Sequence, residues 1–221
     1  MFINDENIEV LDLNFKNLED IPFEVFFLKN LKKLLLYGNK LQNIPKEIKN
    51  LQKLECLDLR DNDLKELPLE IGELKNLKTL YLSQNKIEDL PKSFEKLDNL
   101  QSLFLSKNNI KIVPESICHI KSLQRIILRE NNIEFLPINI KLLENLRNLD
   151  LRKNQIKEIP MQIKYLLNLR NLDLRDNKLN TFPLEIKNLK NLKNISISGN
   201  KFNTSNFKTN FSDKLQKNEE H

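Results

Sequence analysis

Apolar and polar residues along this chain recur with a period of 23 residues from Ile8 onward. Nine successive rows begin at residues 8, 31, 54, 77, 100, 123, 146, 169 and 192. With the first residue of a row counted as position 0, apolar side chains at positions 3 and 5 alternate with polar ones, which is typical of a strand. Later in the row the apolar spacing becomes three, as at Ile48, Leu51 and Leu54, which suits a short helical or 3-10 segment. Each row therefore predicts a short strand, a sharp turn and a tight return.

The eight prolines of the chain share one position in the row. They stand at residues 22, 45, 68, 91, 114, 137, 160 and 183, each 23 residues after the one before. Proline restricts φ and removes a backbone N–H donor. One local backbone geometry therefore recurs through the chain, which indicates a repeat protein.

Rows of equal length stack strand on strand, so the predicted sheet is parallel, with right-handed crossovers. Because the strand side packs more tightly than the return side, we expect the coil to curve with the sheet on its concave face and the returns on its convex face. The predicted fold is an α/β solenoid that forms a single domain over residues 1–221. We expect an N-terminal cap at residues 1–7, nine rows over residues 8–206, and a capping helix with a frayed tail at residues 207–221.

Eight asparagines follow the predicted strands at position 8 of the row: Asn39, Asn62, Asn85, Asn108, Asn131, Asn154, Asn177 and Asn200. A carboxamide both donates and accepts hydrogen bonds. We expect each asparagine to satisfy the turn backbone of its own row and of the next, because a leucine there would leave buried amides unpaired. This asparagine ladder is therefore predicted to be structural, with no ligand or metal role.

The third row reads Leu54, Leu57, Leu59, Asn62, Leu64, Leu67, Pro68, Ile71 and Leu74. In this form the row resembles the leucine-rich repeat family, in the 23-residue class of Ras-suppressor-type proteins, plant intracellular Ras-group-related proteins and many bacterial repeat proteins. The resemblance runs from Ile8 to about Asn206, with departures at Lys16, where asparagine is expected, and at Ser205 and Asn206, where Leu-Pro is expected. The resemblance implies a horseshoe that binds a protein partner on its concave face, and it implies no chemistry.

Strand geometry turns positions 3 and 5 inward, so positions 2, 4, 6 and 7 are expected on the concave face. The predicted partner-binding residues are Leu35, Tyr37, Tyr81, Phe104, Arg125, Ile127, Arg129, Arg152 and Arg175. A contiguous exposed group such as Tyr81, Phe104 and Ile127 usually marks an interaction site, and tyrosine and arginine are frequent binding hot spots. The alternative is that the aromatic residues only stabilise the sheet face through cross-strand contacts.

Acidic and basic residues alternate at positions 4 and 6 of three rows. The pairs are Asp58 with Arg60, Asp150 with Arg152, and Asp173 with Arg175. Exposed ion pairs of this kind contribute about 0–1 kcal/mol to stability, so we interpret them mainly as surface residues of the sheet without a specific role. They could still set the register of a partner through electrostatic complementarity.

The composition argues against catalysis and against nucleic-acid binding. Only three glycines and two histidines occur, so no phosphate-cradling loop is present. His119 beside Cys118 looks like a nucleophile pair, but neighbours on a return segment rarely align, and surface positions are the better interpretation. The net charge of +5 is spread over interleaved Lys and Glu, and Asp150 and Asp173 interrupt the arginines that a phosphate track would need. We therefore expect a non-enzymatic scaffold with no cofactor, no metal and no nucleic-acid partner.

The chain ends and the cysteines bear on compartment and assembly. The first residues are polar and acidic, so they predict no signal peptide, and no apolar run is long enough for a membrane span. Cys56 and Cys118 lie in different rows, and unpaired thiols favour a reducing, cytoplasmic setting, although an effector exported by a dedicated apparatus would look the same. We expect Phe23, Phe26 and Phe27 to cap row one, or alternatively to join two chains, which gives a monomer or a weak end-to-end dimer.

Overall fold

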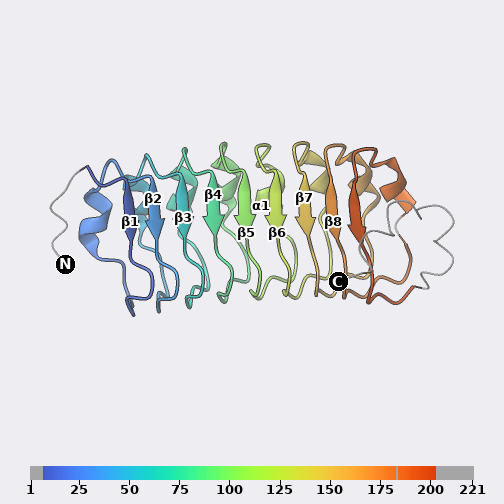
Figure 1. The fold of residues 1–221 in the computed structure, drawn as a ribbon, viewed down its shortest axis with the longest axis horizontal. Coiled ribbons are helices and arrows are strands. Elements are labelled where there is room, and N and C mark those ends of the chain that lie inside the picture. The colour runs from blue at the N-terminus through green and yellow to red at the C-terminus, as the bar shows by residue number, and fades with distance from the viewer. Residues whose placement is uncertain (1–6, 183, 203–221) are drawn as a thin grey trace.

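One parallel sheet runs the length of the molecule in the computed structural model, which describes residues 7–182 and 184–202. Its strands are β1 (Val10–Asp12), β2 (Lys33–Leu35), β3 (Cys56–Asp58), β4 (Thr79–Tyr81), β5 (Ser102–Phe104), β6 (Arg125–Ile127), β7 (Asn148–Asp150), β8 (Asn171–Asp173) and β9 (Asn194–Ser196). The strands follow one another across the sheet in chain order, and neighbours are parallel (Figure 1). The predicted solenoid is confirmed: nine parallel strands form one open, curved sheet.

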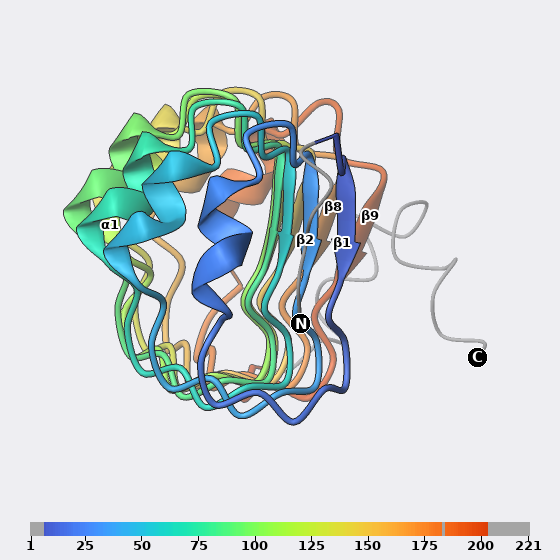
Figure 2. The ribbon, with the colours of Figure 1, turned by 90° about the vertical axis from the view of Figure 1, so that its left-hand side faces the viewer.

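The returns lie on the opposite side of the coil from the sheet (Figure 2). Seven are 3-10 helices, namely η1 (Phe23–Phe27), η2 (Lys46–Asn50), η3 (Leu69–Glu73), η4 (Lys92–Lys96), η5 (Ile138–Leu142), η6 (Met161–Tyr165) and η7 (Leu184–Asn188), and α1 (Glu115–Cys118) is a single α-helical turn. A proline stands immediately before each return. In η2, the Pro45 carbonyl accepts the Ile48 N–H at 3.1 Å. Proline suits this place because its fixed φ is compatible with the first turn, where its missing N–H is not required.

The apolar side chains of positions 3 and 5 fill the space between the sheet and the returns. The register advances by one row at each strand, so that Leu34 pairs with Leu11 on one side and with Leu57 on the other. Both inward columns are buried in every row from β1 to β9. Because side chains alternate along a strand, a slip of one residue would turn these leucines outward. The residues at positions 2 and 4 therefore face the concave side.

After the strand of each row, one residue adopts the left-handed backbone conformation and turns the chain away from the sheet. Position 7 has φ between 53° and 70° in every row. The residues are Phe15, Gly38, Asp61, Gln84, Lys107, Glu130, Lys153, Asp176 and Gly199. A sharp turn was predicted at this place, but a column with only two glycines does not indicate a positive φ. These residues consequently lie in the turn at the edge of the sheet and not on its face, where position 7 was expected.

The asparagine ladder is present in rows two to nine, and every rung has the same geometry. The Nδ2 atom donates at 2.8–3.1 Å to a carbonyl of its own row and to one of the preceding row. In Asn108, for example, Nδ2 binds the carbonyls of Leu82 and Leu105. The Asn108 Oδ1 accepts the Ile87 N–H, 3.0 Å away in the preceding row.

The direction of this bridge was predicted wrongly, because each asparagine binds the preceding row and not the next. A repeating sequence has the same spacing in both directions, so the period alone could not decide between them. In row one the position is Lys16, whose own backbone N–H donates to Asn39 Oδ1 of row two at 3.1 Å.

A second polar ladder, absent from the sequence prediction, joins the rows where each return enters the next strand. Asn76, Asn99, Asn145, Asn168 and Asn191 each donate from Nδ2 to a backbone carbonyl 24 residues earlier, at 2.7–3.0 Å. In row five the same position is Ser122, whose hydroxyl donates at 2.7 Å to the carbonyl of Leu100, the first residue of the same row, so the bond between rows is missing there. The repeated asparagine at position 22 was a signal for this ladder. The rows are thus joined by side chains at both ends of the strand.

The two ends of the coil are only partly described. Most of the expected N-terminal cap, at residues 1–6, and the expected capping helix at residues 207–221 lie outside the described residues. Within η1, Phe26 is buried, whereas Phe23 and Phe27 are each 58% exposed. Whether these two rings cap the coil or join two chains stays a prediction. No helix within residues 7–182 and 184–202 is long and apolar enough to cross a membrane.

Replacing Asn108 by leucine should lower the free energy of unfolding by about 2–4 kcal/mol. The leucine would leave the Ile87 N–H without its acceptor, which costs about 1–3 kcal/mol. It would also remove one of the two carboxamide donors of the Leu82 and Leu105 carbonyls, which keep the bonds from Asn85 and Asn131. Urea denaturation followed by circular dichroism measures this loss.

The matched control is Asn109→Leu at the neighbouring exposed position, where only a backbone hydrogen bond to Ile87 is made. Its effect should stay within about 0.5 kcal/mol. Equal losses in the two variants would show that the ladder does not carry the stability.

Candidate functional site

A continuous row of rings and one guanidinium runs from the turn edge of row one across the concave side of rows two to five. The ring centroids of Phe15 and Tyr37 lie 4.6 Å apart in edge contact. The Arg60 guanidinium carbon lies 5.1 Å from the centroid of Tyr37 and 4.8 Å from that of Tyr81. Tyr81 stacks on Phe104, with centroids 4.6 Å apart and ring planes 14° apart. We name these five residues the concave aromatic row.

The arginine in this row is held in place by Asp58, whose side chain lies at the same strand end. The Asp58 carboxylate is buried, and its Oδ1 accepts the Arg60 Nε–H at 2.9 Å and the Arg60 backbone N–H at 3.1 Å. The side-chain hydrogen bonds raise the pKa of Arg60 above its usual range, so the group stays cationic. Two tyrosine rings therefore flank a fixed charge, an arrangement worth about 0.5–1 kcal/mol per contact at exposed sites. Sequence reasoning placed Arg60 only among the paired charges, although Tyr37 stands at the same position of the adjacent row; its contact with Tyr81 is diagonal across the sheet.

The apolar surface continues from Phe104 to Ile127, its neighbour in the register of β5 and β6. Both side chains are partly exposed. Arg125 and Arg129 flank Ile127 in the same row and are exposed. Neither arginine has a side-chain hydrogen bond or an ion pair within the described residues. Two cations without an ion pair therefore lie beside an apolar surface and are available to a ligand.

The two predicted site residues of row two stand at the other end of this surface. Leu35 is half-buried, with Asp12 and Asp58 as its strand neighbours. Tyr37 belongs to the concave aromatic row, and its backbone N–H donates to Asn14 Oδ1 at 2.7 Å. Both residues face the concave side, as the alternation of the strand predicted.

The arginines of rows seven and eight are engaged with acids. Arg175 Nε donates to Asp173 Oδ1 at 3.0 Å, as the pairing in the sequence suggested. Arg152 does not pair with the Asp150 carboxylate through its side chain; its Nε donates to Asp176 Oδ2 in the next row, at 3.1 Å. Asp150 Oδ1 accepts the Arg152 backbone N–H at 3.0 Å. These two arginines are thus less available to a partner than Arg125 and Arg129.

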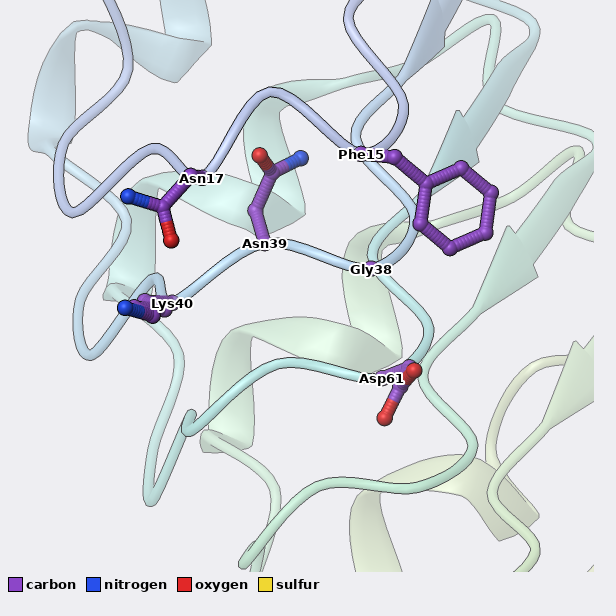
Figure 3. A pocket seen from close by; sticks show the side chains of 6 residues that line it. All are labelled: Phe15, Asn17, Gly38, Asn39, Lys40 and Asp61. Atoms are coloured by element: carbon purple, nitrogen blue, oxygen red, sulfur yellow. The ribbon is translucent and has the colours of Figure 1, made fainter.

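A hollow of about 340 Å³ opens at the turn edge of the first three rows (Figure 3). Its lining is Phe15, Asn17, Gly38, Asn39, Lys40 and Asp61. A Cβ at Gly38 would lie 2.4 Å from the Phe15 ring, so this glycine, with φ of 69°, lets the ring lie across the next turn. Asn39 Oδ1 already accepts the N–H groups of Lys16 and Leu18. Because its carboxamide belongs to the ladder, the polar side chains that this hollow offers a ligand are those of Asn17, Lys40 and Asp61.

The convex side has an exposed apolar column that sequence reasoning missed. Ile138, Met161 and Leu184 stand at position 15 of rows six to eight and are 62%, 54% and 55% exposed. Rows two, four and five carry the charged residues Lys46, Lys92 and Glu115 there, whereas Phe23 and Leu69 of rows one and three are exposed apolar residues without an apolar neighbour in the next row. The run of three apolar residues at one surface position was the available signal. This convex column is a second surface against which the concave one can be tested.

Comparison with known protein families agrees with the geometry of the rows. The family model described as "Leucine-rich repeat region" matches residues 6–103 and 46–127, and that described as "Leucine rich repeat" matches residues 144–202. The chain belongs to the leucine-rich repeat family. No curated protein matches the chain.

Solved leucine-rich repeat structures share the fold. A Leptospira interrogans leucine-rich repeat protein is 34% identical with a TM-score of 0.66, over 89% of this chain and 62% of that one. Internalin C2 from Listeria monocytogenes is 27% identical with a TM-score of 0.77, over 86% of this chain and 81% of that one. The ectodomain of a membrane receptor kinase from Arabidopsis thaliana, in complex with Casparian strip integrity factor 2, is 33% identical with a TM-score of 0.74, over 88% of this chain and 24% of that one. The chain therefore spans less than two thirds of the Leptospira protein and about a quarter of the plant ectodomain.

The possible nucleophile of this leucine-rich repeat protein is inert. Cys118 is fully buried in α1, whereas His119 is exposed, so the expectation that both lie at the surface was wrong for the cysteine. Burial, with a smaller contribution from the charge of Glu115, raises the pKa of the Cys118 thiol to about 12. A thiol of this kind stays protonated at neutral pH and is not a nucleophile. Within residues 7–182 and 184–202, no group of three or more His, Cys, Asp or Glu side chains is placed to hold a metal ion.

Thiol titration of the native protein should detect only Cys56, and slowly. This cysteine is half-buried in β3, and burial also raises its pKa, whereas Cys118 is inaccessible. Ellman's reagent at neutral pH should therefore label about one thiol before unfolding and two after it. The variant Cys56→Ser should show no fast labelling in the native state. Rapid labelling of that variant would contradict the buried placement of Cys118.

Asp150→Asn should stabilise the protein slightly at neutral pH. Burial raises the pKa of the Asp150 carboxyl, and the charge of Asp173 on the adjacent strand adds to the effect. The native state therefore binds this proton more tightly than the unfolded state. Its unfolding free energy consequently falls as pH rises above the unfolded pKa of about 3.9, and the loss persists at neutral pH. An asparagine keeps the acceptor for the Arg152 N–H without the charge.

Urea denaturation at several pH values measures the effect of Asp150→Asn. The gain should be present at pH 7 and should vanish below about pH 3.5, where the carboxyl is protonated in both states. Asp12→Asn is the control, because Asp12 is exposed and makes the same bond to the backbone N–H two residues on. A gain of the same size in both variants at every pH would disprove the assignment to burial.

Proposed function

We propose that this leucine-rich repeat protein is a non-enzymatic scaffold that binds a protein partner across the concave face of its sheet. The observation that supports this best is the concave aromatic row and its continuation through Ile127 to Arg125 and Arg129. Aromatic and arginine side chains are the commonest hot spots of protein interfaces. Here they are contiguous, partly exposed and mounted on a sheet of fixed register.

The order of this surface before binding favours affinity. Tyr81 is stacked on Phe104, and Arg60 is held by Asp58 between two rings. Association normally costs about 0.5–1.5 kcal/mol for each flexible side chain that it immobilises. Side chains that are already held by their neighbours lose less entropy, so more of the contact energy remains as affinity.

The chemistry of the surface describes the partner. Tyr81, Phe104 and Ile127 suit apolar side chains of a protein or peptide. Arg125 and Arg129, which form no ion pair within the described residues, suit a carboxylate next to them. The Arabidopsis ectodomain, whose structure contains a bound partner, offers a parallel for a protein or peptide ligand on this fold. The proposal requires no cofactor, metal or nucleic acid.

We also propose a cytoplasmic setting for this scaffold. Cys56 and Cys118 are both free, and they belong to different rows. Free thiols are compatible with a reducing compartment, where disulfides are rare.

Phe104→Asp should weaken partner binding by about 30-fold or more, the effect of losing a hot spot worth about 2 kcal/mol. The fold should tolerate this change, because aspartate is the native residue at the same position of β1, β3, β7 and β8. The partner would first be captured by affinity purification and then purified. Binding of wild type and variant would be compared by isothermal titration calorimetry, with thermal unfolding as the check on folding.

The matched control is Ile138→Asp, which places the same charge in the exposed convex column. This variant should bind the partner like the wild type. Loss of binding in Ile138→Asp but not in Phe104→Asp would move the site to the convex side and refute the concave proposal.

A further inference from the structure

The residues at position 1, directly before each strand, form a column along one edge of the sheet. They read Glu9, Lys32, Glu55, Lys78, Gln101, Gln124, Arg147, Arg170 and Lys193. The first four alternate in sign, the next two are neutral, and the last three are cationic. The column therefore changes character along the solenoid although its backbone geometry repeats.

The first part of the column is neutralised by pairs between adjacent rows. Lys32 Nζ lies 2.7 Å from Glu9 Oε1, and Lys78 Nζ lies 2.9 Å from Glu55 Oε2. The hydrogen bond to Glu9 raises the pKa of Lys32, and the bond from Lys78 lowers the pKa of Glu55. Side chains at position 1 of adjacent rows can thus reach each other.

The last part of the column has no such neutralisation. Arg147, Arg170 and Lys193 are all exposed, and none forms an ion pair within residues 7–182 and 184–202. Backbone bonds of 2.8 Å, from the Arg170 N–H to the Arg147 carbonyl and from the Lys193 N–H to the Arg170 carbonyl, hold the three rows in register. At a strand spacing of about 4.8 Å, the three backbone sites span about 10 Å. We name these three residues the basic edge.

The residues around the basic edge provide further hydrogen-bond donors and do not neutralise its positive charge. The next residue in each row is an asparagine, and Asn194 Nδ2 donates to Asn171 Oδ1 at 2.6 Å. The acids of β7 and β8, Asp150 and Asp173, lie at the far end of these strands. There they accept backbone N–H groups two residues on, and Asp173 also binds the Arg175 side chain. Neither acid is engaged with the basic edge.

We propose that the basic edge binds an acidic peptide segment of a partner. In an extended chain, side chains on the same face lie about 6.8 Å apart, so two carboxylates at alternate residues can meet three cations spread over about 10 Å. Arginine binds a carboxylate in a bidentate manner, which adds geometric specificity. The proposal goes beyond the function proposed above, because the basic edge and the concave aromatic row are different surfaces and either can bind without the other.

Other polyanions fit the basic edge less well. Single-stranded nucleic acid is usually bound on aromatic residues that stack its bases, and positions 1 and 2 of these three rows carry only arginine, lysine and asparagine. Membrane-binding segments generally use about four to eight clustered cations. Three cations at a sheet edge match a short run of carboxylates better.

Fluorescence anisotropy with fluorescein-labelled hexaglutamate tests this proposal, with labelled hexaglutamine as the neutral probe. Wild type should bind hexaglutamate more tightly than hexaglutamine, and about 0.5 M NaCl should weaken that binding because it screens exposed charges. The double variant R147Q/R170Q should lose about fivefold to tenfold in affinity for hexaglutamate. Circular dichroism would verify that the variant is folded.

The control is K32Q/K78Q, which removes the same charge from the paired part of the column and should change affinity by less than about twofold. Equal losses in both double variants would mean that net charge alone attracts the probe, and would overturn the proposal. Failure of the wild type to distinguish hexaglutamate from hexaglutamine would overturn it as well. Tighter binding of labelled oligothymidine or of phosphatidylserine vesicles would assign the edge to nucleic acid or membrane instead.

Thermal unfolding at low salt gives a second, independent readout. R147Q/R170Q relieves repulsion between like charges on adjacent rows, so its melting temperature should rise relative to the wild type. K32Q/K78Q breaks two ion pairs, so its melting temperature should fall slightly. A fall in R147Q/R170Q would show that these arginines are already compensated in the free protein and would contradict the proposal.

Discussion

A buried carboxamide joins each row of this solenoid to the row before it. The strands are only three residues long, and the chain then turns through a left-handed residue at position 7. Backbone groups in that turn are buried, and strand pairing alone does not reach them. Asparagine meets the need because it donates to two carbonyls and accepts one N–H at once, which neither aspartate nor leucine can do. Since every rung needs the same partners, the row length is constrained, and the constant row length keeps the leucines of all rows in register.

The functional surfaces depend on this regularity. Positions 3 and 5 form the core, and position 8 forms the asparagine ladder. Because positions 1, 4, 6 and 15 are not needed for either, they can hold side chains of different charge and polarity from row to row. The fixed register then lines these residues up across rows, so that single side chains become extended surfaces. The concave aromatic row, the convex column and the basic edge are three products of the same repeat. Each differs along the coil although the backbone does not, as Glu9 and Arg147 show at one position.

Sequence reasoning reached the fold and part of the site. The parallel sheet, the 3-10 returns, the asparagine ladder and the concave placement of Tyr81, Phe104 and Ile127 all follow from spacing. The same reasoning missed Arg60, which lies between Tyr37 at the same position of the row before and Tyr81 diagonally across in the row after, and it placed the buried Cys118 at the surface. It also paired Arg152 with Asp150, whereas the side chain reaches Asp176 in the next row. These errors concern where long side chains go once neighbouring rows surround them.

The sequence by itself determined the period, the alternation of inward and outward residues, and therefore the solenoid and its inner leucines, because these are consequences of backbone geometry repeated at constant length. It also determined which residues appear on each face. Only the tertiary structure decided which of those residues touch. Three features depend on distances between rows: the direction of the asparagine bridges, the place of Arg60 between two rings, and the absence of ion pairs at Arg147 and Arg170 within the described residues. A periodic sequence shows which residues lie in adjacent rows, but it does not show toward which row a side chain points or which rotamer it adopts. Packing in three dimensions decides both.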